Sequence, residues 1–443
     1  MTRPLVAFYG DDFTGSTENL AQFCRHGFRG RLFFSSAAPE RILEMAAELD
    51  VVGLAGTARG LTPSAMTAEV EPALAVIEAI APRLMQFKIC STFDSSPTVG
   101  SIGHVMEMAR RRWPDCALPV MPATPNFGRY TAFSHLFTRY QGDICRLDQN
   151  PGMAHHPSTP MNEADLRRHL TSQTTIAPAA VTLLDYRQAD GGWQALWSAI
   201  EAERFVVLDA TDQAELQQAA ELILRLAEHR PTLAVAAQGL ADAVGRSLTR
   251  DTVVRHPLPT TYHGVARLLV LSGSCSPQTR TQLAHFESLG GCVLSLPPEE
   301  AMRDAPGVAR RLASQVATMF GKGRDVAVAT TRSDTDVIAN LSTEQLAMAV
   351  GEVFARLTRE LREASDLQRV VFAGGDTSSH AMRQLGADAL ELVAFDEAQG
   401  GHLCRLVATD SPVDGLEVVL KGGQIGGEKL LEQVKRGTAH PTH

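Results

Sequence analysis

Two adjacent carboxylates near the start of the chain are the first residues whose types and spacing could do chemistry. Asp11 and Asp12 follow the apolar run Leu5–Tyr9 and precede Phe13-Thr14-Gly15-Ser16, which can open a helix. A carboxylate in such a turn can orient a hydroxyl group and take its proton. The alternative is that one aspartate only caps the helix, although a cap does not need two acids. We predict that Asp12, or else Asp11, is a general base.

Positively charged side chains lie within or just after two further strand-like runs. Lys88 lies within Gln86–Cys90 and leads into a segment rich in Ser and Thr, and Arg59 follows Val51–Ala55. Lysine supplies charge and arginine can grip a carboxylate with two N–H groups. Each also has a plainer interpretation, as a solvated lysine in a turn and as a surface arginine. Ligands of open α/β sheets bind beyond the carboxyl ends of strands, so these positions favour an anion-binding role.

Three loops of small residues in the second half of the chain each follow a strand-like run and precede a helical segment. They are Ser272-Gly273-Ser274-Cys275-Ser276, Gly374-Gly375-Asp376-Thr377-Ser378 and Lys421-Gly422-Gly423-Gln424-Ile425-Gly426. A polyphosphate needs such unobstructed backbone N–H groups and positive helix ends. Asp376 could hold Mg²⁺, which favours few carboxylates together with phosphate oxygens. Any α/β protein contains tight strand–helix turns, but three such loops favour nucleotide binding.

Several other sites are excluded by missing motifs. The chain has no Gly-x-x-x-x-Gly-Lys-[Ser/Thr] loop and no Gly-x-Gly-x-x-Gly after the first strand-like run. Ser274 lacks the Gly-x-Ser-x-Gly elbow of esterases. The pair His155-His156 has no further histidine at metal-ligand spacing, and Cys90 has no histidine nearby in sequence.

Composition limits the possible partners and surroundings. The 443 residues include 41 Lys+Arg and 50 Asp+Glu, a net charge of −9, which disfavours nucleic-acid binding. No apolar run is long enough to span a membrane, and the N-terminus lacks a signal-peptide pattern. The seven cysteines are scattered without a Cys-x-x-Cys pair, so we expect a reducing, cytoplasmic environment. Base rates favour a symmetric homodimer.

Short apolar runs alternate with helix-length stretches along the whole chain. Val181–Leu184 is another of the expected strands, and Ala214–His229 and Thr343–Ala364 are expected helices. This alternation predicts an α/β protein of two domains, each a mainly parallel or mixed sheet flanked by helices. Residues 250–264 contain Pro257 and Pro259 and lack apolar periodicity, which is typical of a linker. We predict domains at 1–249 and 265–443, joined by a linker at 250–264.

Taken together, these segments resemble the four-carbon acid sugar kinase family, long catalogued as a domain of unknown function. The matching segments occur in family order: Asp11-Asp12-Phe13-Thr14-Gly15, residues 88–96, Gly100-Ser101-Ile102-Gly103, Gly128-Arg129-Tyr130, residues 156–161, and the three loops of the second half. The segment Lys88-Ile89-Cys90-Ser91-Thr92-Phe93-Asp94-Ser95 looks most like the 3-oxo-tetronate kinase branch.

The resemblance implies an ATP-dependent kinase that phosphorylates the terminal hydroxyl of a four-carbon acid sugar, with an N-terminal acid-sugar domain, a C-terminal nucleotide domain and an active site in the interdomain cleft. It implies that the substrate is bound by Asp11, Arg59, Lys88, Ser91 and Asp94. For ATP and Mg²⁺ it implies Ser274, Gly374, Gly375, Asp376, Thr377, Gly422 and Gly423.

Two other functions stay open at this stage. One is a catalytically silent protein on the same fold that binds an acid sugar or a nucleotide, because a fold does not fix a function. The other is a dehydrogenase of hydroxy acids, which would bind NAD in place of ATP.

Overall fold

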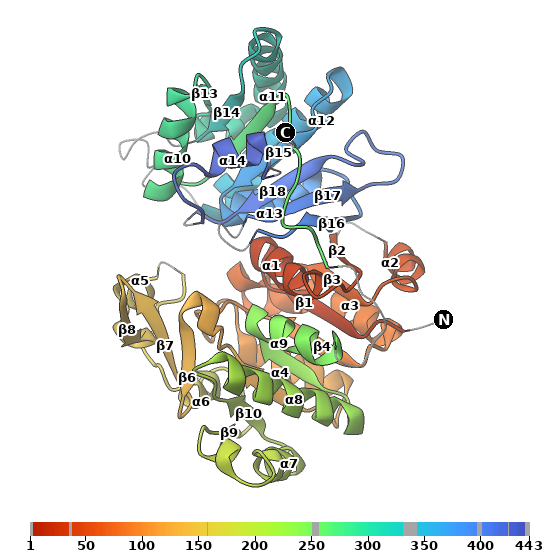
Figure 1. Ribbon diagram of the computed structural model, residues 1–443, viewed down its shortest axis with the longest axis vertical. Helices are drawn as coiled ribbons and strands as arrows, with labels where there is room; N and C mark the ends of the chain where they lie inside the picture. The colour runs from red at the N-terminus through yellow and green to blue at the C-terminus, as the bar shows by residue number, and fades with distance from the viewer. Residues whose placement is uncertain are drawn as a thin grey trace, which may run out of the picture. The chain divides into compact units, whose positions relative to one another are not determined.

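The computed structural model describes residues 3–34, 38–156, 158–249, 257–330, 343–396, 401–423 and 425–438, with only the backbone at Thr343, Glu344 and Asp376. The chain folds into two compact units. Unit 1 comprises Met1–Gly30 and Pro39–Pro257, and unit 2 comprises Arg31–Ala38 and Leu258–His443. Figure 1 shows the elements of each unit.

Unit 1 is built on a parallel sheet whose strands are apolar on both faces. Its order is β3-β1-β4-β11-β5-β10-β9, and every neighbouring pair is parallel. The strands are β1 (Val6–Gly10), β3 (Val51–Ala55), β4 (Leu84–Lys88), β5 (Leu118–Met121), β9 (Pro178–Val181), β10 (Phe205–Leu208) and β11 (Leu233–Ala236). Strands β1, β3 and β4 are buried along their whole length. Parallel sheets need helices on both faces to be buried in this way.

Two sets of packed helices supply that cover. One contact series runs through α1 (Phe13–Cys24), α9 (Gln238–Thr249), α8 (Gln213–His229) and α7 (Trp193–Glu201). The other runs through α2 (Pro39–Ala46), α3 (Pro63–Ile80), α4 (Ile102–Arg112) and α6 (Leu166–Thr171). The short helix α5 is Pro151–Ala154.

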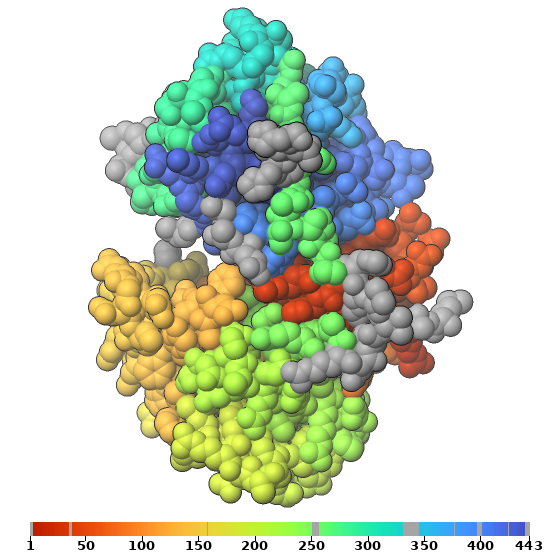
Figure 2. All heavy atoms as spheres, in the orientation of Figure 1, coloured from red at the N-terminus to blue at the C-terminus, as the bar shows by residue number. Residues whose placement is uncertain are grey.

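A small antiparallel sheet completes unit 1. It consists of β6 (Arg129–Ala132), β7 (His135–Tyr140) and β8 (Asp143–Arg146). In Figure 2 this part of the chain forms the yellow-orange surface at the left. The turns Phe133-Ser134 and Gln141-Gly142 both have positive φ angles, as tight two-residue hairpin turns require.

Unit 2 contains a mixed sheet of order β13-β14-β12-β15-β18-β17-β16-β2. The parallel part is β13 (Cys292–Ser295), β14 (Val326–Ala329), β12 (Leu268–Ser272), β15 (Arg369–Ala373) and β18 (Glu417–Lys421). Strands β17 (Leu403–Val407), β16 (Ala389–Ala394) and β2 (Gly30–Phe34) extend it antiparallel. Helices α11 (Pro298–Gly321), α12 (Thr343–Ala364) and α13 (Gly375–Gln384) pack in series, and α10 (Pro277–Ser288) packs on α14 (Leu430–Arg436).

Strand β2 comes early in the chain but pairs with the sheet of unit 2. Leu32 and Phe33 lie opposite Leu390 and Ala389 of β16. The amide of Phe34 donates to the carbonyl of Asp388 at 2.9 Å. The expected division at 1–249 and 265–443 places this strand in the first domain, because the run itself carries no signal of which sheet it joins. Of the expected linker, residues 250–256 lie outside the described residues, and 257–264 are almost entirely irregular.

The predicted α/β class with flanking helices is confirmed by the structure and by the family comparisons reported below. The predicted strand Val181–Leu184 is wrong after its first residue, because β9 ends at Val181. There the carboxylate of Asp185 accepts hydrogen bonds from the amide and hydroxyl of Thr182, both at 2.7 Å, which closes a turn. No helix in the described ranges is long and apolar enough to cross a membrane.

Arg369 is a buried ion-pair centre that ties unit 2 together. Its guanidinium pairs with Glu417 Oε2 at 2.6 Å and donates to the carbonyls of Val434 and His263. Removing one partner of a buried pair strands the other charge. We expect Arg369→Met to lower the free energy of unfolding by about 3–5 kcal/mol in a denaturant titration. Arg311→Met, which breaks an exposed pair with Glu300, should change it little, and equal effects of the two variants would contradict the assignment.

Candidate functional site

The carboxyl ends of three neighbouring strands bring the predicted substrate-side residues of unit 1 together. In the sheet register, Gly10 of β1 lies opposite both Ala55 of β3 and Lys88 of β4. The next residue, Asp11, donates its amide to the carbonyl of Lys88 at 3.1 Å. The carbonyl of Asp11 in turn accepts from the amide of Arg59 at 3.2 Å. Asp11, Arg59 and Lys88 therefore share one edge of the sheet.

Arg59 forms ion pairs with both aspartates. Its Nε and Nη2 bind the two carboxylate oxygens of Asp11 at 3.2 and 2.6 Å, and Nη2 also donates to Asp12 Oδ1 at 2.7 Å. The two-armed carboxylate grip expected of Arg59 is thus made to Asp11. No hydrogen bond of Nη1 is recorded among the described residues, so that nitrogen is the end of Arg59 that remains for a ligand.

Asp12 is both the cap of α1 and the more accessible of the two acids. Its carboxylate accepts from the amide of Gly15 at 3.1 and 3.2 Å, which is the capping role left open by the sequence. Its side chain is 22% exposed, against 5% for Asp11. Capping and contact with a ligand are therefore compatible at this residue.

The charges around the two acids push their pKa values apart. Burial raises the pKa of Asp11, with the neighbouring Asp12 adding to the effect and Arg59 opposing it. Burial also acts against ionisation of Asp12, but the positive charges of Arg59 and Lys88 outweigh it and hold the pKa of Asp12 below its usual range. Asp12 is accordingly an ionised carboxylate at neutral pH.

Gly15 lets the backbone pass between Asp12 and Lys88. A Cβ atom at Gly15 would lie 2.4 Å from Asp12 Oδ1 and 2.7 Å from Lys88 Nζ. Lys88 is 1% exposed and donates to the carbonyl of Ile89 at 2.8 Å. The hydroxyl of Thr14, beside Gly15, is buried and has no hydrogen-bond partner in the described part of the chain.

The segment after β4 adds further polar groups to this edge. Thr92 donates to Asp94 Oδ1 at 2.7 Å and lies 2.9 Å from the sulfur of Cys90. Burial, with Asp94 next in size, raises the pKa of the Cys90 thiol to about 11, so Cys90 is not a reactive thiolate. Ser91 is half-buried, and its side chain makes no recorded hydrogen bond among the described residues.

A buried network of hydrogen bonds supports this segment. Ser95 Oγ lies 2.9 Å from His169 Nε2, and Gln173 Nε2 lies within 3.0 Å of both. Ser95 is 1% exposed and donates to the carbonyl of Phe93, which adopts a positive φ of 60°. Burial lowers the pKa of His169 to about 4. The pair is therefore a structural support and not an exposed nucleophile with its base.

Arg129, at the start of β6, joins this group although the sequence analysis gave it no role. Its Nη1 donates to the carbonyls of Phe127 and Gly128 at 2.9 and 3.2 Å, and its buried Nε has no partner among the described residues. Burial lowers the pKa of Arg129, with Cys90 and Asp94 acting in the opposite direction. The signal in the sequence was the segment Gly128-Arg129-Tyr130 itself.

In unit 2 the three small-residue loops also meet at strand ends. Strands β12, β15 and β18 are neighbours, and Ser272, Ala373 and Lys421 lie side by side at their carboxyl ends. The amide of Gly273 donates to the carbonyl of Ala373, and that of Gly374 to the carbonyl of Lys421. The predicted residues Ser274, Gly374, Thr377 and Gly423 are thereby gathered in one region, and Gly375 and Gly422 lie next to them in sequence.

Close approach between these loops depends on glycine. A Cβ at Gly273 would lie 2.3 Å from Thr377 Oγ1, and Gly374 has a positive φ of 114°. By contrast, a Cβ at Gly375 would meet nothing within 4 Å. Gly375 is the first residue of α13, whose first-turn amides have no acceptor within the helix. The loop and the helix end together bring backbone N–H groups into one region.

Hydroxyl groups also lie at the N-terminal end of α10, which follows the first of the three loops. Ser276 caps α10 by accepting from the amide of Thr279 at 3.1 Å. Ser274 Oγ accepts from the amide of Ser276 at 3.2 Å and lies 3.1 Å from Thr279 Oγ1. Thr279 also contacts the carbonyl of Gly423 at 3.1 Å, which fixes the third loop against this helix.

Lys421 is the residue of this region that sequence reasoning passed over. It is 0% exposed, and its Nζ donates to Thr279 Oγ1 at 2.9 Å. Burial lowers its pKa to about 8. The available signal was its position, because Lys421 closes β18 as Lys88 closes β4.

No group of three or more His, Cys, Asp or Glu residues that could hold a metal occurs among the described residues. The side chain of Asp376, the expected Mg²⁺ ligand, lies outside them, as does Gln424. The position of the carboxylate expected to bind Mg²⁺ is therefore not described.

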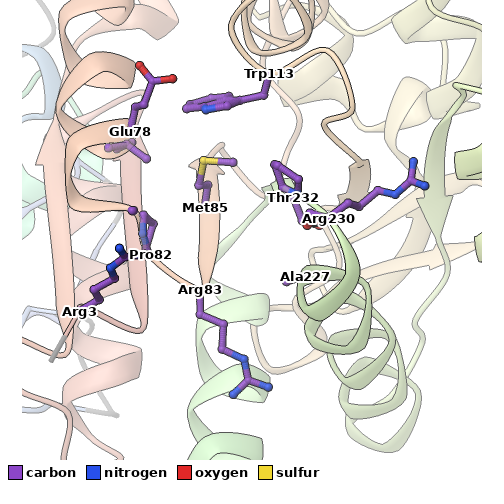
Figure 3. Close-up of a pocket in the computed structure, with 12 residues that line it drawn as sticks. Arg3, Glu78, Pro82, Arg83, Met85, Trp113, Ala227, Arg230 and Thr232 are labelled. Carbon is purple, nitrogen blue, oxygen red and sulfur yellow. Dashed lines mark hydrogen bonds between the residues drawn. The ribbon is translucent and has the colours of Figure 1, made fainter.

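A separate cavity of about 320 Å³ lies at the opposite, amino-terminal edge of the unit 1 sheet. Met85, near the start of β4, forms its floor, and Trp113 lies over it (Figure 3). The lining arginines Arg83 and Arg230 extend away from the cavity in different directions (Figure 3). Because these guanidinium groups do not converge, we assign no function to this cavity.

The lowered pKa of His169 makes stability depend on pH. The unfolded chain binds a proton near pH 6.5, whereas the folded state holds His169 neutral down to about pH 4. Stability should therefore fall as the pH is lowered through this window, by up to about 1.4 kcal/mol per pH unit. Chemical unfolding at pH 7 and pH 5 should show a smaller loss for His169→Gln than for wild type. The exposed control His229→Gln should retain the wild-type loss, and identical losses in all three proteins would contradict this role.

Comparison with known families agrees with the two-unit organisation. Residues 6–244 match the model of a sugar-binding N-terminal domain, and residues 269–431 match that of a nucleotide-binding C-terminal domain.

Relatives match over nearly the whole length of the chain. A 3-oxo-isoapionate kinase of Paraburkholderia graminis is 33% identical, over 98% of this chain and 94% of that protein. A 3-oxo-tetronate kinase of Pectobacterium atrosepticum is 28% identical, over 96% and 97%. The fold is shared with a Haemophilus influenzae protein of a domain family of unknown function, with a TM-score of 0.73 at 22% identity over 97% and 98% of the two chains. The chain belongs to the four-carbon acid sugar kinase family, with its sugar-binding domain at the N-terminus and its nucleotide-binding domain at the C-terminus.

Proposed function

We propose that this protein transfers the γ-phosphoryl group of ATP, with Mg²⁺, to the terminal hydroxyl of a four-carbon acid sugar of the 3-oxo-tetronate type. The observation that carries the proposal is an ionised, partly exposed Asp12 beside Lys88 in the sugar-binding domain of a kinase family. Phosphoryl transfer asks little covalent chemistry of a protein, and positioning and charge stabilisation dominate.

Asp12 is the general base of this scheme. A base must be ionised and within reach of the hydroxyl, and Asp12 meets both needs better than Asp11, which is buried and held by Arg59. Asp11 then serves to hold Arg59 and the turn in place. The unpartnered hydroxyl of Thr14 is a nearby group that can hydrogen bond to the substrate.

The carboxylate of the acid sugar needs cationic N–H donors that the protein does not already use. Arg59 has Nη1 left for this task, because its other arms are bound to Asp11 and Asp12. Arg129 has no ion pair among the described residues and shares the electrostatic environment of Asp94 and Cys90. We assign carboxylate binding to these two arginines, with Lys88, Ser91 and Asp94 contacting the sugar.

The triphosphate is assigned to the glycine loops of unit 2. Ser274 and the first-turn amides of α13 at Gly375 and Thr377 supply donors. Gly422 and Gly423 are assigned to the same site, where Gly423 lets the third loop lie against Ser274 and Ser276. Asp376 is the second residue of the same helix and is assigned to Mg²⁺, which would neutralise charge on the phosphate oxygens. Transfer then requires the γ-phosphorus to come within reach of the acceptor oxygen.

A panel assay tests the proposed function directly. Purified protein with ATP and Mg²⁺ should release ADP when 3-oxo-tetronates or related four-carbon acids are added, and should release little with the matching uncharged polyols. Binding of both ligands without ADP release would favour a catalytically silent protein. Binding of NAD but not ATP would contradict the proposal in favour of a dehydrogenase.

Replacing the base should slow the chemical step without loosening the nucleotide. We expect Asp12→Asn to lower kcat by roughly 10²–10⁴, because it removes a general base, while the Kd for ATP stays near the wild-type value. The matched control is Asp212→Asn, since Asp212 caps α8 through the amides of Ala214 and Glu215 at 2.8 Å. Steady-state kinetics in which both variants lose the same small factor would assign Asp12 to capping alone.

The open space beside Gly375 gives a second test. An added methyl group there meets no atom of the described residues within 4 Å, so Gly375→Ala should keep the wild-type melting temperature. If phosphates occupy that space, the Kd for ATP should rise about tenfold or more through steric overlap. Gly321→Ala, which also meets nothing within 4 Å and lies at the end of α11, is the control. Unchanged ATP affinity in both variants would remove Gly375 from the phosphate site.

A further inference from the structure

Lys421 is a buried cation without a counter-anion in the described part of the chain. Its ammonium group is 0% exposed and has one recorded contact, with Thr279 Oγ1 at 2.9 Å. Placing a charge out of water costs several kcal/mol unless an opposite charge offsets it. The charged form of Lys421 is therefore disfavoured in the protein without ligands, and burial lowers its pKa to about 8.

The other buried cations of the described residues are compensated. Lys88, at the equivalent end of β4, faces the charges of Asp11 and Asp12. Arg369 is paired with Glu417 Oε2 at 2.6 Å. Of the three lysines and arginines that are at most 2% exposed, Lys421 alone has no acidic group against it in the described part of the molecule. The contrast indicates that none of the described side chains supplies its counter-anion.

The hydroxyl groups around Lys421 connect it to the loops. Thr279 Oγ1 accepts from Lys421, and its own proton has two acceptors in reach, Ser274 Oγ and the carbonyl of Gly423, each 3.1 Å away. Ser274 Oγ also accepts from the amide of Ser276 at 3.2 Å. When Thr279 donates to Ser274, both acceptor positions of Ser274 are used, and the proton of Ser274 is left to donate to another group. No protein acceptor for that proton is recorded among the described residues.

We propose that Lys421 is a positioning residue whose missing counter-anion is the phosphate chain of the nucleotide, and that it acts on that chain through Thr279 and Ser274. The inference rests on the proposed function and deepens its nucleotide site. Lys421 closes β18 directly before Gly422 and Gly423, and its ammonium shares Thr279 Oγ1 with the carbonyl of Gly423. The ammonium holds Thr279 as an acceptor, Thr279 turns its proton to Ser274, and Ser274 presents its own proton to a phosphate oxygen.

Binding should then change the protonation of Lys421. Near pH 8.5 most of the free protein carries a neutral Lys421, whereas bound phosphates favour the ammonium form. Nucleotide binding at this pH should take up well over half a proton, and about a tenth of a proton at pH 7. The phosphates themselves are already fully ionised at pH 8.5, so they contribute nothing to this uptake.

Titration calorimetry with the full-length protein measures the uptake directly. ATP, ADP and adenosine are titrated at pH 8.5 in two buffers with different ionisation enthalpies. For wild type we expect proton uptake with ATP and ADP and none with adenosine. Lys421→Met should abolish the uptake and weaken ATP binding at least about tenfold, with adenosine affinity unchanged. The exposed control Lys322→Met should behave as wild type.

A charge-preserving variant guards against a folding defect. Lys421→Arg keeps a positive charge at all these pH values, so it should bind ATP better than Lys421→Met yet show no proton uptake. Wild-type affinity and uptake in Lys421→Met would overturn this inference and leave the proposed function intact. Equal loss of ATP and adenosine binding in both Lys421 variants would assign the lysine to folding and also overturn it. A wild-type protein that binds no nucleotide would overturn the proposed function and this inference together.

Discussion

A buried charge must meet an opposite charge, and this constraint shapes the edges of both sheets. In unit 1 Asp11 and Lys88, at the ends of β1 and β4, are buried. Asp11 is paired with Arg59, which follows β3 and is 26% exposed. The network is nearly self-sufficient, and that is why one of its acids, Asp12, can remain ionised and partly exposed. In unit 2 the corresponding position is filled by Lys421, for which the described residues supply no acid. The two units thus offer different chemistry at the carboxyl ends of their strands. Unit 1 presents the ionised carboxylate of Asp12, and unit 2 presents Lys421 without an acid among the described residues.

Small residues make these edges accessible to ligands. Gly15 leaves room between Asp12 and Lys88, and Gly273 lets the loop after β12 lie against Thr377. The positive φ of Gly374 lets the chain turn directly into α13, whose first amides have no acceptor within the helix. In both units a strand ends, a glycine permits close approach, and a helix begins with unsatisfied N–H groups. The arrangement suits an anionic substrate in the first unit and a polyphosphate in the second.

Local patterns in the sequence were sufficient for the parallel strands and the strand-end loops. The apolar runs before Asp11, Lys88, Ser272 and Gly374 are strands, and the helix over Thr343–Ala364 has the predicted bounds. Strand β2 could not be assigned to the second sheet, since pairing between distant segments leaves no mark in a five-residue run. The β6–β8 sheet was missed because its strands are short and partly polar. Arg129 and Lys421 were missed for a related reason: whether a cation is buried without a counter-charge depends on tertiary contacts.

The most direct test of the central claim is a crystal structure of the protein with a non-hydrolysable ATP analogue, Mg²⁺ and a four-carbon acid sugar. The account predicts phosphate oxygens within hydrogen-bond distance of Ser274 Oγ and the amides of Gly375 and Thr377, and the terminal hydroxyl of the acid against Asp12. A triphosphate bound away from the turns at 272–276, 374–378 and 421–423, or an acid sugar with no contact to the Asp12 edge, would contradict it.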